Sequence, residues 1–115
     1  MTFKAVLAVI PVRELDSATR WYESFFGRPA DQRPMDTLAE WHLSDLGVVQ
    51  VFQDPSRAGH TSVNFTVDDL DAALATLSGA GINTTDPQLV SSDTQRLATT
   101  TDDDGNTLGL IQFVG

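Results

Sequence analysis

The feature that most constrains this fold is an internal repeat. "VRELDSA" at residues 12–18 matches "VDDLDAA" at residues 67–73, 55 positions further along the chain. Val, Leu, Asp and Ala coincide, and Glu14 of the first copy corresponds to Asp69 of the second. A match at a fixed offset indicates two copies of one supersecondary unit.

Each copy of the motif lies between a strand-like run and a helical pattern. "KAVLAVIPV" precedes the first copy and "TSVNFTV" precedes the second. Apolar residues then recur at i, i+3, i+4 and i+7, as on the buried stripe of an amphipathic helix, and each stripe stops before a glycine that can cap it. The stripes are Leu15, Ala18, Tyr22, Phe25 and Phe26 before Gly27, and Leu70, Ala73, Leu74, Leu77 and Ala80 before Gly81.

A polar connector and a hairpin follow each predicted helix. The connectors, 28–37 and 82–95, each leave room for a short edge strand. The first hairpin turns at residues 44–47, and the second turns at Asp104-Gly105-Asn106, where Asp-Gly favours the positive φ of a tight turn. Each half therefore reads as βαβββ. The sequence predicts an α+β fold, one domain over 1–115, with modules at about 1–54 and 60–115 in a curled mixed sheet around a cleft and helices on the outer face.

Composition excludes several classes of function. The net charge of −9, from 16 acidic and 7 basic residues, opposes nucleic-acid binding, which needs clusters of Lys and Arg. The acidic surface can serve solubility or attract a cationic ligand. No cysteine is present, and no apolar run approaches the ~20 residues that span a bilayer. We read the N-terminal run as a strand rather than a signal peptide, and predict a cytoplasmic protein with no membrane or nucleic-acid partner.

The order of these elements resembles a known superfamily. Paired βαβββ modules with V-x-[DE]-L-D-x-A at each helix start, and D-x-D-G-N-T-L at residues 102–108, resemble the vicinal oxygen chelate superfamily of glyoxalases, extradiol dioxygenases and bleomycin-resistance proteins. The resemblance covers nearly the whole chain. It implies two modules around a cleft that is often completed in a homodimer.

The resemblance also implies four metal-ligand positions, and here all four differ. They are Leu7, Gln50, Ser62 and Gly109, where the metalloenzymes carry imidazoles and carboxylates. Leu and Gly offer no side-chain donor, and Ser and Gln are poor ligands for a divalent transition metal. We therefore expect no metal cofactor and no catalytic residue. Two alternatives stay open: Gly109 only marks a β-bulge, or an alignment slip of two residues places His60 at one ligand position.

Strand alternation predicts which side chains line the cleft. If the first hairpin pairs Trp41 with Gln50 and Ala39 with Phe52, these four share the cleft face. The candidate ligand-binding residues are Leu7, Trp41, Gln50, Phe52, Ser62, Asn64, Arg96 and Thr100. Such a lining suits a flat or amphipathic molecule. Trp41 and Phe52 can equally belong to the core or a dimer interface, Arg96 can be a surface charge, and His42 is expected to point away from the cleft.

Three functions remain compatible with the sequence. The favoured one is a metal-free binding protein of the bleomycin-resistance type, which sequesters an aromatic or cationic molecule in a cleft, as a homodimer. The second is an enzyme of the superfamily with a displaced metal site or metal-independent chemistry, in which His42 or His60 could act as acid or base. The third is a protein without a small-molecule ligand, whose cleft is filled by a partner or by its own side chains.

Overall fold

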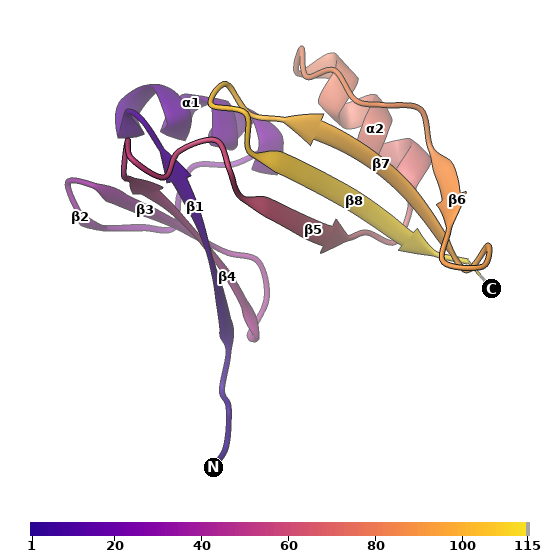
Figure 1. Cartoon of the computed structure of the whole chain (residues 1–115), viewed down its shortest axis with the longest axis horizontal. Helices are drawn as coiled ribbons and strands as arrows, with labels where there is room; N and C mark the ends of the chain where they lie inside the picture. Colours follow the sequence, from indigo (N-terminus) through magenta and orange to yellow (C-terminus); the bar gives the residue numbers. More distant parts are fainter. Residues whose placement is uncertain (115) are drawn as a thin grey trace.

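The internal repeat folds as two βαβββ modules, as the sequence predicts. The computed structural model describes residues 1–114 (Figure 1). The first module contains β1 (Val6–Val12), α1 (Leu15–Phe26), β2 (Gln32–Met35), β3 (Leu38–His42) and β4 (Gly47–Gln53). The second contains β5 (Ser62–Thr66), α2 (Leu70–Gly79), β6 (Gln88–Val90), β7 (Gln95–Thr101) and β8 (Thr107–Phe113). No helix in the described range is long and apolar enough to cross a membrane.

Each module forms its own mixed sheet. The strand orders are β1-β4-β3-β2 and β5-β8-β7-β6, with β1 parallel to β4 and β5 parallel to β8. The α+β class is confirmed, with one difference from the predicted continuous sheet: no strand pairing within residues 1–114 joins the two halves. The sheets diverge from each other in Figure 1, so β1 and β5 each keep one unpaired edge.

The helix boundaries follow from local chemistry. The side chain of Asp69 accepts a hydrogen bond of 3.0 Å from the backbone N–H of Ala72, which satisfies one orphan donor at the start of α2. Gly27 ends α1 with φ 76°, and Gly81 follows α2 with φ 82°, a region that favours glycine. Both predicted helices and their glycine stops are confirmed.

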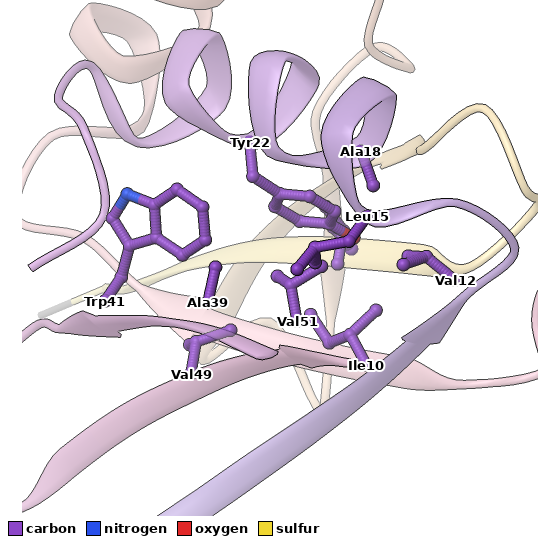
Figure 2. Packing of buried hydrophobic residues seen from close by; sticks show 10 residues of the cluster. Ile10, Val12, Leu15, Ala18, Tyr22, Ala39, Trp41, Val49 and Val51 are labelled. Atoms are coloured by element: carbon purple, nitrogen blue, oxygen red, sulfur yellow. The ribbon is translucent and has the colours of Figure 1, made fainter. Parts of the chain in front are cut away.

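The helix α1 packs against both modules. Its Leu15, Ala18 and Tyr22 lie in a buried cluster with first-sheet residues and with Leu108 of β8. Figure 2 shows Tyr22 pointing from α1 towards the sheet, in the same layer as Trp41. A second cluster, between α2 and the second sheet, is also contacted by Trp21 and Phe25. The aromatic face of α1 therefore joins the two cores.

The register of the first hairpin differs from the prediction by one residue. The structure pairs Trp41 with Val49 and Glu40 with Gln50, rather than Trp41 with Gln50. A one-residue shift turns every side chain to the opposite face. Trp41 is therefore 0% exposed in the core, where its Nε1 donates a hydrogen bond of 3.0 Å to the backbone oxygen of Arg28. The predicted place of Trp41 in the cleft is wrong, and its alternative role as a core residue is the observed one.

The predicted face of β7 is also wrong. Ala98 is buried in the cluster under α2, so Arg96 and Thr100, two residues away on either side, share that helix-covered face. Arg96 forms an ion pair of 2.9 Å with Asp71 of α2, and its guanidinium holds the pKa of the Asp71 carboxyl below its usual range. Thr100 donates a hydrogen bond of 2.6 Å to the backbone oxygen of Asn83. Both polar side chains therefore make contacts within the second module.

Candidate functional site

The face of the first sheet opposite α1 carries no other element of the described chain. Side chains alternate between the two faces along a strand, so a residue whose sequence neighbours point into the core points to this face. This uncovered face of the first sheet consists of Leu7, Val9, Leu38, Glu40, His42, Val48, Gln50 and Phe52. Leu7 is 51% exposed and Val9 is 45% exposed, so the face presents an apolar surface rather than a single exposed side chain. The face is largely apolar, with three polar groups near its centre.

The second sheet has an uncovered face of a different kind. Asn64 of β5 pairs with Gly109 of β8, and Gly109 pairs with Thr99 of β7. Along with Gly109 and the apolar residues Leu97, Ile111 and Phe113, the members of this face are neutral polar residues: Ser62, Asn64, Thr66, Gln95, Thr99, Thr101 and Thr107. Hydroxyl and amide groups can both donate and accept hydrogen bonds. This face therefore suits a neutral polar surface of a ligand.

Gly109 lacks a side chain because Asn64 occupies the space. A Cβ added at Gly109 would collide with Oδ1 of Asn64 and would lie 3.3 Å from Cδ1 of Leu97. The pairing of β7 with β8 continues regularly through Thr99–Gly109, so the alternative reading of Gly109 as a bulge is excluded. The amide of Asn64 lies where the superfamily resemblance implies a metal-binding carboxylate.

Five of the eight residues predicted for the site lie on uncovered sheet faces, in two separate groups. Leu7, Gln50 and Phe52 lie on the uncovered face of the first sheet, and Ser62 and Asn64 lie on that of the second. Trp41, Arg96 and Thr100 lie on the helix-covered faces. His60 is exposed in the linker, two residues before β5. Within residues 1–114 no group of three or more His, Cys, Asp or Glu side chains is placed to hold a metal ion.

Sequence reasoning missed Glu40 as a residue of the first face, and its expectation that His42 points away from the cleft is wrong, because the observed register places both on the uncovered face. Glu40 accepts a hydrogen bond of 2.6 Å from Nε2 of Gln50, and its other carboxylate oxygen lies 3.3 Å from Nε2 of His42. The Glu40 side chain is 12% exposed and that of His42 is 44% exposed. The observed register is set at the hairpin loop, where Leu43 N–H donates to the oxygen of Gly47 at 2.9 Å across residues 44–46, so Glu40 lies opposite Gln50. Apolar residues on both faces of β4 left no sequence signal for this register.

The D-x-D-G-N segment forms a structural connection between the modules. The side chain of Asp102 accepts hydrogen bonds of 2.9–3.0 Å from the backbone N–H groups of Asp104, Gly105 and Asn106. Its second oxygen accepts a hydrogen bond of 2.7 Å from Tyr22 Oη. Burial of Tyr22, followed by the charge of Asp102, raises the pKa of the phenol far above its usual range. Tyr22 therefore remains a hydrogen-bond donor.

Asn106 completes this connection. Its Nδ2 donates to the backbone oxygen of Pro11 in β1 and to Asp102, both at 2.8 Å. Its Oδ1 accepts from the backbone N–H groups of Gly59 and Thr61 in the linker, at 3.1 and 3.0 Å. A cavity of about 220 Å³ lies beside this network. Three of its four acidic residues have partners: Asp102 is bonded to Tyr22, Asp104 to Arg13 and Glu14 to Ser17, whereas Asp103 is exposed. We assign the motif a structural role.

A cavity of about 600 Å³ lies between the modules on the helix-covered side. Phe25 and Phe26 of α1, Val6 and Ala8 of β1, residues 63–66 of β5 and the following Val67 line it. Since four consecutive residues of β5 and the residue after it take part, the cavity runs along the unpaired edge of that strand. Its walls are mostly apolar and hold no charged residue, which is typical of a surface that another chain covers.

Comparison with known proteins identifies the architecture. No protein-family model and no curated protein matches the sequence. A glyoxalase/bleomycin resistance protein from Catenulispora acidiphila is 26% identical, with a TM-score of 0.88, over 97% of this chain and 100% of that one. A bleomycin-binding protein complexed with bleomycin is 25% identical, with a TM-score of 0.79, over 98% and 100%. TnmS3, an antibiotic binding protein from a Streptomyces species, shares the fold at 21% identity and a TM-score of 0.79, over 98% of each chain. The chain therefore has the structure of the glyoxalase/bleomycin resistance protein family, within the vicinal oxygen chelate superfamily, over nearly its full length.

Proposed function

We propose that this protein binds and sequesters a small organic molecule, aromatic or cationic, without a metal, between the uncovered sheet faces of a homodimer. One observation carries the proposal: all four family metal-ligand positions hold non-ligating residues, and Asn64 fills the space at the last of them. A face that is apolar with a few polar groups favours ligand binding over metal chemistry. The predicted cytoplasmic location is part of the proposal.

The structural neighbours favour the same kind of role. One is described as a bleomycin-binding protein complexed with bleomycin, and another as an antibiotic binding protein. The fold alone supports many functions, so the function must be inferred from the residues of the uncovered faces. Here they combine an apolar wall around Leu7 and Phe52 with a neutral polar wall around Ser62 and Asn64.

The homodimer is supported by apolar surface that the single chain leaves uncovered. Phe3 is 83% exposed, Val6 is 72% exposed, and both lie near the open edge of β1. The radius of gyration, 14.4 Å, exceeds the roughly 13 Å typical of a compact chain of this length. A second copy related by a two-fold axis is the commonest way to cover such a surface. Light scattering should give twice the 12.5 kDa chain mass, and a mass of 12.5 kDa at micromolar concentration would contradict the dimer.

Ligand binding is tested on protein dialysed against a chelator. We expect bleomycin, or another aromatic or cationic antibiotic in a panel, to raise the melting temperature, because a ligand that binds only the folded state stabilises it. Calorimetry should then give a defined stoichiometry, and elemental analysis of the purified protein before dialysis should find no stoichiometric Zn, Ni, Fe or Mn. About one tightly held metal per chain would overturn the metal-free proposal. A panel that leaves the melting temperature unchanged would contradict sequestration of this class of molecule.

The Glu40–His42 pair favours one alternative, an enzyme with metal-independent chemistry. A carboxylate that orients an imidazole is a recurring arrangement for general acid-base catalysis. If this alternative holds, a bound compound should be converted to product, and His42→Ala should abolish turnover while binding persists. If the compound is recovered unchanged after prolonged incubation, the binding role stands.

A further inference from the structure

The uncovered face of the first sheet has one carboxylate near its centre. Glu40 lies on β3, which is flanked by β2 and β4, and it pairs with Gln32 on one side and Gln50 on the other. Gln50 in turn pairs with Val9 of β1. A glutamate in the middle of a sheet face is unusual, since charged side chains are normally found on well-solvated surfaces.

Glu40 has no permanent cation as a partner. Its oxygens receive hydrogen bonds from the neutral amide of Gln50 and contact His42, and no Lys or Arg of the described chain forms an ion pair with it. Two arginines near β2 and β3 already have partners: Arg28 is held by Asp31 and by the backbone oxygen of His42, and Arg33 by Asp16. Because a carboxylate offers about four acceptor sites, two hydrogen-bonding partners leave it with unused capacity.

The surroundings of the Glu40 carboxylate strengthen its attraction for an additional cation. The Glu40 side chain is only 12% exposed, so much of its hydration is already lost. Leu38 lies beside it on the same strand face, Val9 of β1 pairs with Gln50, and Phe52 lies two residues from Gln50 on β4, opposite Leu38. A partly desolvated anion in apolar surroundings interacts more strongly with an added cation than an anion in water does.

We propose that Glu40 is the residue that recognises a positively charged group of the ligand. The cation is an ammonium, amidinium or guanidinium group attached to an apolar or planar aromatic frame. Gln50 holds the carboxylate in place, and the frame lies over the apolar residues around it. This inference rests on the proposed function and deepens it, because it gives one residue control over the charge of the ligand.

The test uses two probes that share one frame and differ in charge. At mildly alkaline pH, 9-aminoacridine is a cation, whereas acridine has the same three rings and is neutral. Their dissociation constants are measured by fluorescence for wild-type protein, Glu40→Gln and Asp93→Asn. Glu40→Gln keeps the shape and an acceptor for Gln50. Asp93→Asn removes the same charge from an exposed loop between β6 and β7, at a φ of 63° that asparagine tolerates.

The wild type should prefer the cation. Glu40→Gln should weaken binding of the cation about tenfold or more, which corresponds to about 1.4 kcal/mol. The same variant should change acridine binding less than about twofold. Asp93→Asn should bind both probes as the wild type does. If Glu40→Gln binds the cation unchanged, or loses both probes equally, this inference fails while the proposed function stands. If the wild type binds neither probe nor any antibiotic of the panel, the proposed function fails and the inference fails with it.

A second measurement needs no variant. Glu14, Glu23 and Glu40 are the three glutamates of the chain, so carboxyl carbon signals in protein labelled at glutamate can be assigned individually. The cationic probe should shift the Glu40 signal strongly and the other two little, and acridine should shift it far less. Equal shifts of Glu40 with both probes would contradict recognition of charge.

Discussion

Tyr22 Oη donates a hydrogen bond of 2.7 Å to Asp102 Oδ2, and this bond joins residues 80 positions apart. Tyr22 projects from α1 of the first module, whereas Asp102 begins the loop between β7 and β8 of the second. Both side chains are buried. Since no strand pairing joins the two sheets in the described range, this bond, the network of Asn106 and the aromatic face of α1 set how the modules meet.

Removing the phenol oxygen should destabilise the protein without changing its ligand site. Tyr22→Phe deletes one hydrogen bond to a buried carboxylate, which costs about 1.5–3 kcal/mol. Urea unfolding should show this loss as a lower midpoint with an unchanged slope. Ser24→Ala is the control, because Ser24 Oγ makes an exposed bond of 3.4 Å to Arg20 O on the same helix. Equal midpoints for Tyr22→Phe and wild type would show that the hydrogen bond makes no net contribution to the free energy of unfolding.

The raised pKa of Tyr22 predicts a loss of stability at alkaline pH. Above pH ~10 an unfolded tyrosine loses its proton, whereas buried Tyr22 keeps it, so the unfolded state binds fewer protons and the free energy of unfolding falls. The slope should approach about 1.4 kcal/mol per pH unit, and Tyr22→Phe should lack this contribution. Tyr22 is the one tyrosine of the chain, so tyrosinate absorbance reports on it alone. Gradual ionisation near pH ~10 in folded protein would contradict its burial.

Asn106 should be among the least replaceable polar residues. Asn106→Ala leaves the N–H groups of Gly59 and Thr61 and the oxygen of Pro11 without their partner. With about 1–3 kcal/mol for each buried group that stays unpaired, a loss of roughly 3–5 kcal/mol is expected. Chemical denaturation measures it, with exposed Asn83→Ala as the matched change. Similar losses in the two variants would mean that water replaces the lost bonds.

Trp41 and Phe52 should respond oppositely to truncation. Trp41→Ala removes a fully buried ring and should cost about 3–5 kcal/mol, with less for Trp41→Phe. Phe52 is half-buried on the uncovered face, so Phe52→Ala should cost less stability but weaken dimerisation or ligand binding. Unfolding midpoints and binding constants, measured side by side, separate the two roles. Normal stability together with lost binding in Trp41→Ala would restore the register predicted from the sequence.

Gly109 and Asn64 should be energetically coupled. Gly109→Ala places a methyl group against the Asn64 amide and should cost about 1–2 kcal/mol. In an Asn64→Ala background the space is free, so the same change should cost at least about 0.5 kcal/mol less. A double-mutant cycle in urea measures the difference. Strictly additive effects would show that the Asn64 side chain turns aside at no cost.

The sequence by itself determined the modular plan. The repeated V-x-[DE]-L-D-x-A motif predicts both helices, because apolar spacing and glycine stops are local properties of the chain. The Asp104-Gly105 turn is confirmed for the same reason, since Gly105 adopts a φ of 101°. The four non-ligating positions could also be identified from sequence order alone, because the resemblance depends on motif spacing.

Only the tertiary structure decided which face each strand buries. In "GVVQVFQ" both faces of β4 carry apolar residues, so hydrophobic alternation could not choose between two registers one residue apart. The buried position of Trp41 depends on contacts with α1 and on the Arg28 backbone, which lie far away in sequence. The same holds for Arg96, which turns to Asp71 of α2, and for Glu40, which the register sets beside Gln50. Local patterns specify elements, but the choice of face is made by packing between elements, and in this chain that choice determines which residues are available to a ligand.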